Sequence, residues 1–366
     1  MLRSSRPRSV RFGLIALLGA VAGIYLAFGI LTARETLGCD FLVYREAALE
    51  LLAGRPIYDP SITETGSCNL YYYPPPFVAL VLPFAILPIT AGILAWIAFL
   101  TVCFVAGCLV MPVRAEVRLA VFMLGAVSWP FIFGVRIGQV APILFLLFAI
   151  GWRRLDRPEI TGASAALGAL VKLQPAVLFG WLIVRRAWRG LAAALVVGLA
   201  VSVAGALVGL GAWVDMMAVL QNLETAIDHP ANLSLGAIGY EHGLSLAAAS
   251  TLQTLGAVAV LGLVVLWALR GAAEAGFLVA VVASQLVSPI IWAHYALILL
   301  LPVAWLLERR QWWAAIVPLS QAWVLLPFMT AEIYLLGFYV VLAAVPIVDW
   351  RRDARPAVVP SGAVRA

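Results

Sequence analysis

Long apolar runs dominate the pattern of hydrophobic and polar positions along this chain of 366 residues. Runs of about 15 to 25 apolar residues recur between short polar breaks, and an α-helix needs about 20 such residues to cross a bilayer. An outer-membrane barrel would show short alternating segments instead. The pattern therefore predicts an all-α, polytopic integral membrane protein with about 11–13 transmembrane helices. We place the spans at residues 12–32, 91–111, 117–134, 139–152, 160–172, 174–184, 190–210, 247–269, 275–290, 293–308, 311–328 and 332–348.

Composition and charge agree with this assignment and orient it. The chain is 64% hydrophobic and only 11% charged, with 24 Lys and Arg residues. Because cytoplasmic loops are enriched in Lys and Arg, placing both termini in the cytoplasm puts 19 of these 24 residues there. The short spans are placed with this rule in view, so the split is part of the assignment and does not test it. Orientation accounts for the net charge of +6, and no nucleic-acid partner is predicted.

The spans form one predicted transmembrane domain, residues 1–350, in a plasma or inner membrane. The first apolar run follows four arginines and lacks a small-residue cleavage site after it, so we expect a retained helix and not a signal peptide. External loops are expected at 33–75 and 211–246, and residues 351–366 are expected to form a disordered cytoplasmic tail.

Three apolar segments make poor spans. Prolines interrupt residues 75–88, so we expect this segment to re-enter the membrane or to lie along its outer surface. As helices, residues 160–172 and 174–184 would reach only about 20 and 16 Å. The tip between them must then lie within the membrane or a recess, where irregular backbone is tolerated only if it is buried in protein or lines a wet cavity.

Asp40 is the strongest candidate for chemistry. It opens a polar stretch, residues 39–73, in which apolar residues at positions 44, 47, 48, 51 and 52 have helical spacing. This spacing predicts an amphipathic helix on the outer membrane surface. An acidic side chain beside aromatic residues at that depth is costly unless something uses it. The alternative is that Asp40 merely caps the helix N-terminus, which leaves unexplained the polar groups that other spans bring to this side.

Lys172 and Gln139 are two of those polar groups. Lys172 is the only lysine and stands in VKLQP at the tip of the short hairpin, where its charge needs a carboxylate or phosphate partner. The alternative is a lysine that snorkels to the interface. Gln139 stands in RIGQVAP after Arg136 and a glycine that allows close approach of backbone to a ligand, although a plain turn fits the motif equally.

Further candidates lie on the same predicted side. His229 and Asn232 belong to a polar patch in DHPANLSL, and His294, in SPIIWAHY, begins a span, where a core or cap role is the alternative. Asn232 also begins a glycosylation-acceptor pattern, which we discount without a eukaryotic secretory context. Three tyrosines, Tyr44, Tyr58 and Tyr73, complete the set of expected substrate contacts.

The four cysteines fall into two pairs. Cys39 and Cys68 lie on the outer side, where a disulfide and two free thiols are equally open, and Cys103 and Cys108 lie within a span. No Cys or His spacing resembles a zinc site. The chain also lacks a Walker loop and a dinucleotide fingerprint, so we expect neither a metal nor a soluble nucleotide donor.

The order of these motifs resembles that of a known family. The motifs are DFLVY from Asp40, GRPIYDP, YPP from Tyr73, Gly138-Gln139, KLQP from Lys172, Asn232-Leu233-Ser234, and Ser288-Pro289 with His294. Together they resemble the polyprenol-phosphate-mannose-dependent α-mannosyltransferases of glycosyltransferase family 87, within the GT-C superfamily of membrane glycosyltransferases. The resemblance covers roughly residues 12–348, and its specificity lies in the joint order of the motifs.

The resemblance implies a GT-C fold and an inverting transfer of a hexose, usually mannose, from a polyprenyl-phosphate donor to a glycan or glycolipid acceptor outside the cell. Asp40 matches the family's general base, and Lys172 its donor-phosphate lysine, with Arg136 as a weaker phosphate candidate. His294 matches its late histidine. Ala141 stands where the family usually has Asn, which leaves the part played by the Gln139 turn open.

Two other classes of membrane protein compete with a transferase. A lipid or glycan transporter or flippase would also be polytopic with broken helices, but it needs paired repeats and a route open to both sides, and the sequence shows neither. A non-catalytic subunit of a glycan-assembly pathway is the third class. The transferase hypothesis requires Asp40 and Lys172 to share one wet pocket.

Overall fold

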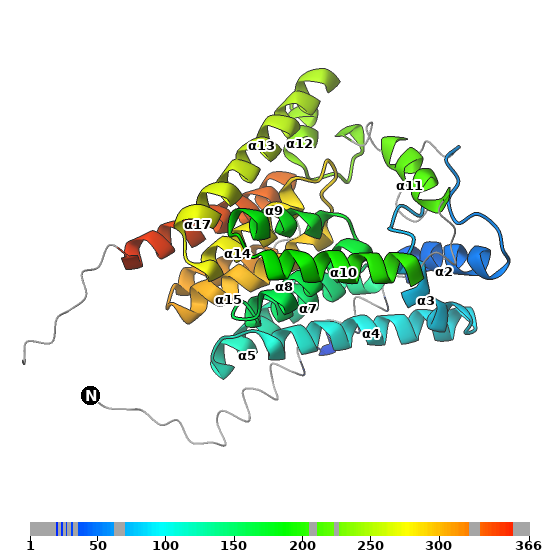
Figure 1. Ribbon diagram of the computed structural model, residues 1–366, viewed down its shortest axis with the longest axis horizontal. Helices are drawn as coiled ribbons and strands as arrows, with labels where there is room; N and C mark the ends of the chain where they lie inside the picture. The colour runs from blue at the N-terminus through cyan, green and yellow to red at the C-terminus, as the bar shows by residue number, and fades with distance from the viewer. Residues whose placement is uncertain are drawn as a thin grey trace, which may run out of the picture.

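The computed structural model describes residues 36–61, 70–204, 211–222, 227–321 and 330–353, together with positions 20, 23, 24, 27 and 31. Within these residues the regular structure is helical throughout, and no strand is present. The prediction of an all-α fold is therefore confirmed. The predicted span at 12–32 lies almost entirely outside the described residues. Most helices pack into one bundle, and α13 leans away from it (Figure 1).

In chain order the helices are α2 (Cys39–Leu52), α3 (Phe77–Ala85), α4 (Ile89–Val110), α5 (Ala115–Ala126), α6 (Trp129–Ile137), α7 (Ala141–Arg153), α8 (Pro158–Val171), η2 (Gln174–Ala176), α9 (Val177–Val184), α10 (Trp188–Ala204), α11 (Gly211–Asn222), α12 (Leu235–Glu241), α13 (Leu246–Arg270), α14 (Ala273–Leu286), η5 (Ala293–Leu299), α15 (Leu300–Glu308), η6 (Trp312–Ala315), α16 (Ile316–Ser320) and α17 (Ala331–Asp353).

Three of the described helices, α4, α13 and α17, are long and apolar enough to cross a membrane. The span predicted at 117–134 is instead divided into α5 and α6, which are bent by 62° and together could form a fourth crossing. The break falls at Ser128, whose backbone is extended, and Pro130 stands in the first turn of the new helix, the one helical position that suits its missing N–H. Shorter apolar helices fill most of the other predicted spans.

The irregular segments follow the predictions closely. Residues 77–85 form only the short helix α3, which contains Pro83 and packs against α2 and α4. Helix α8 ends at Val171, Lys172 has an extended backbone, and the chain turns back through η2. The predicted tail begins later than residue 351, because α17 continues to Asp353; residues 354–366 lie outside the described part of the chain.

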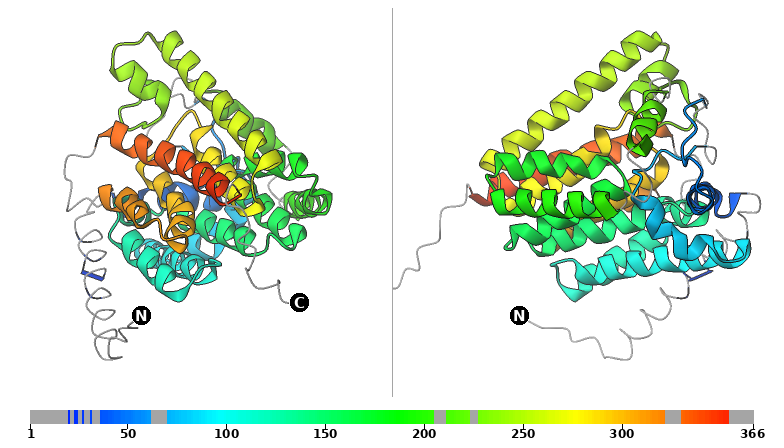
Figure 2. Two further views of the ribbon diagram at one scale, coloured as in Figure 1. Left: turned by 90° about the vertical axis from the view of Figure 1, so that its left-hand side faces the viewer. Right: turned by 45° about the vertical axis from the view of Figure 1, so that its right-hand side comes forward.

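The basic loops lie at one end of the bundle, where polar contacts join them. These contacts join Arg114 to Glu308, Arg309 to Glu274, Arg153 to the Val110 carbonyl and Arg185 to the Ala268 carbonyl. The start of α4 lies at the opposite end, where Ile93 packs against Gly38. Helix α2 therefore lies at the far end from α5 and α15, as Figures 1 and 2 show. This separation is what the loop charges predicted for the candidate site.

Close packing of α8 on α10 depends on Gly162. A Cβ atom at this position would lie 1.9 Å from the Gly190 carbonyl oxygen, and small residues let membrane helices approach in this way. We expect Gly162→Ala to lower the free energy of unfolding by about 3 kcal/mol, the upper range for overpacking. Thermal unfolding of purified protein in detergent measures the change. Gly198→Ala is the control, because its added Cβ meets nothing within 4 Å; equal unfolding temperatures for the two variants would contradict this account.

Candidate active site

Helix α2 carries Asp40 in its first turn, but the aspartate does not cap the helix. The N-cap residue is Gly38, with φ of 70°, and no side chain caps the helix. The Gly38 N–H donates to the Arg136 carbonyl (2.8 Å), which ties the start of α2 to the end of α6. Asp40 Oδ2 instead accepts a hydrogen bond from Gln139 Nε2 at 2.7 Å. The capping interpretation of Asp40 is therefore wrong.

The turn before Gln139 requires glycine. Gly138 has φ of 84°, and a Cβ there would lie 2.8 Å from the Phe41 Cβ. The Trp96 indole N–H donates to the Gly138 carbonyl at 2.7 Å and holds the turn. The Gln139 side-chain oxygen accepts from the Val140 N–H at 2.8 Å. Its amide N–H₂ group is thereby aimed at Asp40, which a plain turn would not require.

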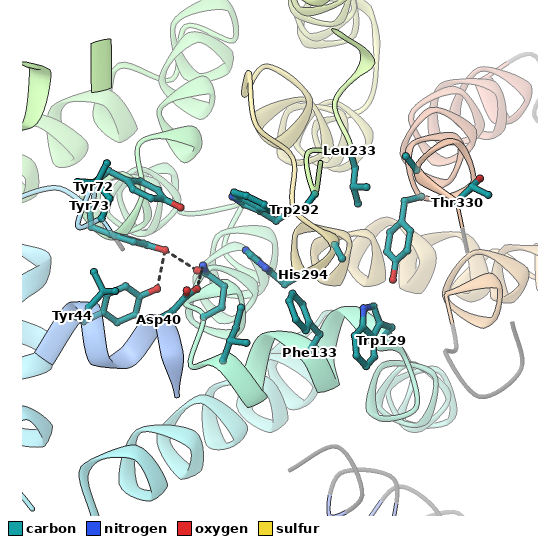
Figure 3. A pocket seen from close by; sticks show the side chains of 18 residues that line it. Asp40, Tyr44, Tyr72, Tyr73, Trp129, Phe133, Leu233, Trp292, His294 and Thr330 are labelled. Carbon is teal, nitrogen blue, oxygen red and sulfur yellow. Dashed lines mark hydrogen bonds between the residues drawn. The ribbon is translucent and has the colours of Figure 1, made fainter. Parts of the chain in front are cut away.

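Tyrosines extend the hydrogen-bond chain from Asp40 (Figure 3). Tyr73 donates to the Gln139 side-chain oxygen at 3.0 Å, and Tyr44 donates to the Tyr73 hydroxyl at 2.8 Å. Tyr58 donates to the Tyr73 carbonyl and lines an outer groove separate from Asp40. Two of the three predicted tyrosines therefore reach the aspartate through this chain, and Tyr58 fixes the backbone beside it.

A cavity of about 270 Å³ opens in front of Asp40. Its polar groups are few and its walls are mainly aromatic, the usual character of a small-molecule site. Residues that line it include Asp40, Tyr44, Tyr72, Tyr73, Trp129, Phe133, Gln139, Trp292, His294 and Tyr334 (Figure 3).

Burial raises the pKa of Asp40 from 3.8 to about 6, although the positive charge of Lys172 and the hydrogen bond from Gln139 both act in the opposite direction. Near neutral pH the group is therefore a carboxylate whose affinity for a proton is greater than that of an exposed aspartate. A group of this kind can accept a proton from a hydroxyl in the cavity.

Lys172 is 8% exposed and lies among aromatic rings. Its Nζ is 4.1 Å from the centre of the Tyr295 ring and 5.7 Å from that of Tyr73. Contact with these rings stabilises a buried ammonium group. Among the described residues, no carboxylate forms an ion pair with it. The ammonium group is thus held in place without a neutralising partner.

Lys172 lines a second cavity, of about 660 Å³. The residues that line both cavities are Tyr72 and Trp292. Asp40 and Lys172 therefore border two adjoining cavities at the same end of the bundle, in place of the single pocket that the sequence predicted. Packed helices do not separate the two groups, and the charge of each influences the other.

His294 is 3% exposed and borders the Asp40 cavity. Its ring lies 6.3 Å from the Phe133 ring and 4.9 Å from the Tyr295 ring, centre to centre. Neither ring nitrogen has a hydrogen-bond partner among the described residues. Because unpaired buried polar atoms are costly, this histidine is available to a ligand in the cavity.

Besides Tyr58, three predicted site residues line neither cavity. The Arg136 guanidinium lies over the rings of Trp129 (5.5 Å) and Phe133 (5.4 Å). Asn232 is fully buried, and its side chain bonds the Ile291 N–H and the Pro289 carbonyl. His229 packs edge-on against Trp292, 5.0 Å between ring centres. These residues hold the walls of the site in position.

The cysteines divide as the sequence divided them. Cys39 is disulfide-bonded, whereas Cys103 and Cys108 are free and buried in α4. Cys68, the candidate partner of Cys39, lies outside the described residues.

Tyr72 and Trp292 are site residues that the sequence did not single out. Both stand beside predicted ones, in the run Tyr71-Tyr72-Tyr73 and two residues before His294. That adjacency was the available signal. Buried Gln285 is a third such residue, because it joins Lys172 and His294 around a small internal cavity.

Comparison with known proteins identifies the family of this chain. The model of glycosyltransferase family 87 matches residues 71–291, more than half of the chain. No curated protein and no solved structure gives a significant match. Three described helices, and one bent pair, are long and apolar enough to cross a membrane. This chain is therefore a membrane protein, and it belongs to glycosyltransferase family 87.

Proposed function

We propose that this glycosyltransferase moves a hexose, mannose in the first instance, from a polyprenyl-phosphate donor to an acceptor hydroxyl on the outer face of the plasma or inner membrane. The observation that carries the proposal is a half-buried carboxylate and a buried ammonium group that border adjoining cavities without pairing. A substrate that lies between them would use both charges. The basic loops at the opposite end of the bundle support the outward orientation.

The Lys172 cavity suits the lipid-phosphate part of the donor. Its walls are largely apolar, with Val177, Leu220 and Ile227 among them. A polyprenyl chain gains from burial on such a surface. Lys172 would then face the phosphate and stabilise the charge that grows on it as the sugar leaves. The leaving group is a single phosphate, so one fixed ammonium group meets its charge without a metal ion.

The Asp40 cavity suits the acceptor. Asp40 would accept the proton of the acceptor hydroxyl while its oxygen forms a bond to the anomeric carbon. The bond between that carbon and the phosphate oxygen breaks, and its electron pair stays on the phosphate beside Lys172. Attack opposite the leaving group inverts the configuration, so a β-linked donor gives an α-linked product. Aromatic walls and the unpaired nitrogens of His294 remain to contact the sugars.

Incubation of the purified protein in nanodiscs with radiolabelled polyprenyl-phosphate mannose and a panel of glycolipid acceptors tests this function. We expect a new α-linked glycan and release of polyprenyl phosphate, both insensitive to EDTA. Transport of intact donor across the bilayer without a new glycosidic bond would instead favour a flippase. Absence of both would contradict the proposal for the donors and acceptors used.

The pH dependence of turnover should report Asp40. Because the base must be ionised, we expect the rising limb of the profile of kcat/KM against pH to have its midpoint near pH 6. The Gln139 N–H stabilises the carboxylate, so Gln139→Leu should raise the pKa and move the midpoint to higher pH. Profiles of kcat/KM against pH, from initial rates at donor concentrations well below KM, measure both midpoints. Thr101→Val, whose hydroxyl bonds only the Ile97 carbonyl within α4, is the control. Identical midpoints for Gln139→Leu and wild type would contradict the assignment of Asp40.

A further inference from the structure

The boundary between the two cavities is formed by two aromatic side chains. Tyr72 and Trp292 border both cavities and are partly exposed. The indole nitrogen of Trp292 faces the Tyr72 hydroxyl across this boundary (Figure 3). An indole N–H can only donate a hydrogen bond, whereas the Tyr72 hydroxyl can donate or accept one. The contact between these two side chains divides the Lys172 side from the Asp40 side.

Both rings are held from behind. Tyr72 stacks on Tyr73, with 5.3 Å between ring centres and 18° between planes, so it rests on the tyrosine that bonds Gln139. Trp292 packs against His229, and the backbone N–H before it is held by the Asn232 side chain at 3.0 Å. The positions of His229 and Asn232, outside the cavities, are thereby explained. A fixed aromatic pair is suited to orient a ligand.

The reaction geometry gives this boundary a role. In an inverting displacement the leaving phosphate and the incoming hydroxyl lie on opposite sides of the anomeric carbon. With the phosphate beside Lys172 and the hydroxyl beside Asp40, the sugar ring must lie between the two cavities.

We propose that Tyr72 and Trp292 form the subsite that binds the transferred sugar, an inference that rests on the proposed function. The Trp292 ring packs against the C–H face of the sugar. The Tyr72 hydroxyl forms a hydrogen bond with a sugar hydroxyl, either as donor or as acceptor. The lipid phosphate is bound elsewhere, so these two residues should recognise the sugar and not the lipid.

Two lipid probes separate recognition of the sugar from recognition of the lipid phosphate. The first is polyprenyl phosphate, and the second is the same lipid carrying mannose. We expect Trp292→Leu to weaken binding of the mannose-bearing lipid by about 10-fold or more, the effect of losing a buried aromatic contact. Affinity for polyprenyl phosphate should stay within about 2-fold of wild type. Tyr72→Phe, which keeps the ring and loses one hydrogen bond, should weaken only the mannose-bearing lipid, by about 5-fold.

Two further variants serve as controls. Trp292→Phe keeps an aromatic face and should recover part of the lost affinity. Trp188→Leu removes a tryptophan that is 58% exposed at the start of α10, and it should leave both affinities unchanged. Equal weakening of both lipids by Trp292→Leu would show a structural or lipid-binding role and overturn the inference. So would unchanged affinity for both lipids.

Measurements on the wild-type protein distinguish failure of this inference from failure of the proposed function. If the wild type transfers mannose but gains no affinity from the sugar, the subsite is wrong while the proposed function stands. If the wild type binds neither lipid and transfers no sugar, the proposed function itself fails.

Discussion

Asp40→Asn should reduce transfer of the sugar by about 10²- to 10⁴-fold, the usual contribution of a general base. The asparagine side chain has nearly the same shape and can still accept a hydrogen bond from Gln139, whose N–H donates to Asp40 at 2.7 Å. It cannot accept the proton of the acceptor hydroxyl. The effect should therefore fall on kcat, with little change in donor KM. Initial rates over a range of donor concentrations separate the two constants.

The same variant should be more stable than the wild type at neutral pH. The folded state raises the pKa of Asp40 from 3.8 to about 6, so it binds more protons than the unfolded state between these values. Stability contributed by the protonated form is therefore lost as pH rises through this window. The ionised carboxylate costs at most about 3 kcal/mol, and less where water in the cavity solvates it. Asp40→Asn removes that cost, so its unfolding temperature should rise at pH 7 and not at pH 4.

Glu46→Gln is the matched control, because Glu46 is an exposed carboxylate on the same helix. It should change neither the rate nor the unfolding temperature. An Asp40→Asn enzyme that retains wild-type turnover would rule out Asp40 as the base. Loss of activity together with a lower unfolding temperature would indicate a damaged fold instead.

The parts of the fold that could be predicted are the helices whose length is determined by the hydrocarbon core of the membrane. Helices α4 and α13 begin and end within about two residues of the predicted spans, and α17 begins within one residue of its span but continues five residues beyond it. The agreement arises because a membrane helix must be continuously apolar over its length. The bend between α5 and α6 was missed. Both sides of the break are apolar, so hydropathy alone cannot separate a continuous span from a broken one.

The site could be predicted only in part. The sequence identified Asp40, Gln139 and Lys172 as polar groups on one side of the protein, and the structure brings all three to the two cavities. It did not indicate which way a polar side chain points. Asn232 and Arg136 are polar and near the site, yet they hold other residues in place. Whether a side chain faces a cavity depends on contacts between distant segments.

Tyr72 and Trp292 are the converse case, because they border the cavities but were not predicted from the sequence. Tyrosine and tryptophan are common at membrane interfaces, so an aromatic residue in such a chain carries little information about a ligand. Only the packing of the loop at 70–76 against the loop at 288–292 reveals that the two residues share a boundary.

Lys172→Met should reduce kcat by about 10²- to 10³-fold, comparable to the loss of one fixed group that stabilises charge in a transition state. Methionine fills much of the same volume between the rings of Tyr73 and Tyr295, so the fold should be kept. Affinity for polyprenyl phosphate should also fall, because the charge is needed in the ground state as well. Lys172→Arg keeps the charge in a planar group of different geometry and should recover part of the affinity.

Arg136→Met is the matched control for the loss of a cation. Arg136 is another basic residue at the same end of the bundle, but it lies over Trp129 and Phe133 and borders neither cavity. We expect less than about a 10-fold loss of rate, since it affects the cavity wall only through weak ring contacts. A larger loss for Arg136→Met than for Lys172→Met would move the donor phosphate to the Arg136 side. Because the sugar lies between phosphate and base, that result would also require a different position for the sugar.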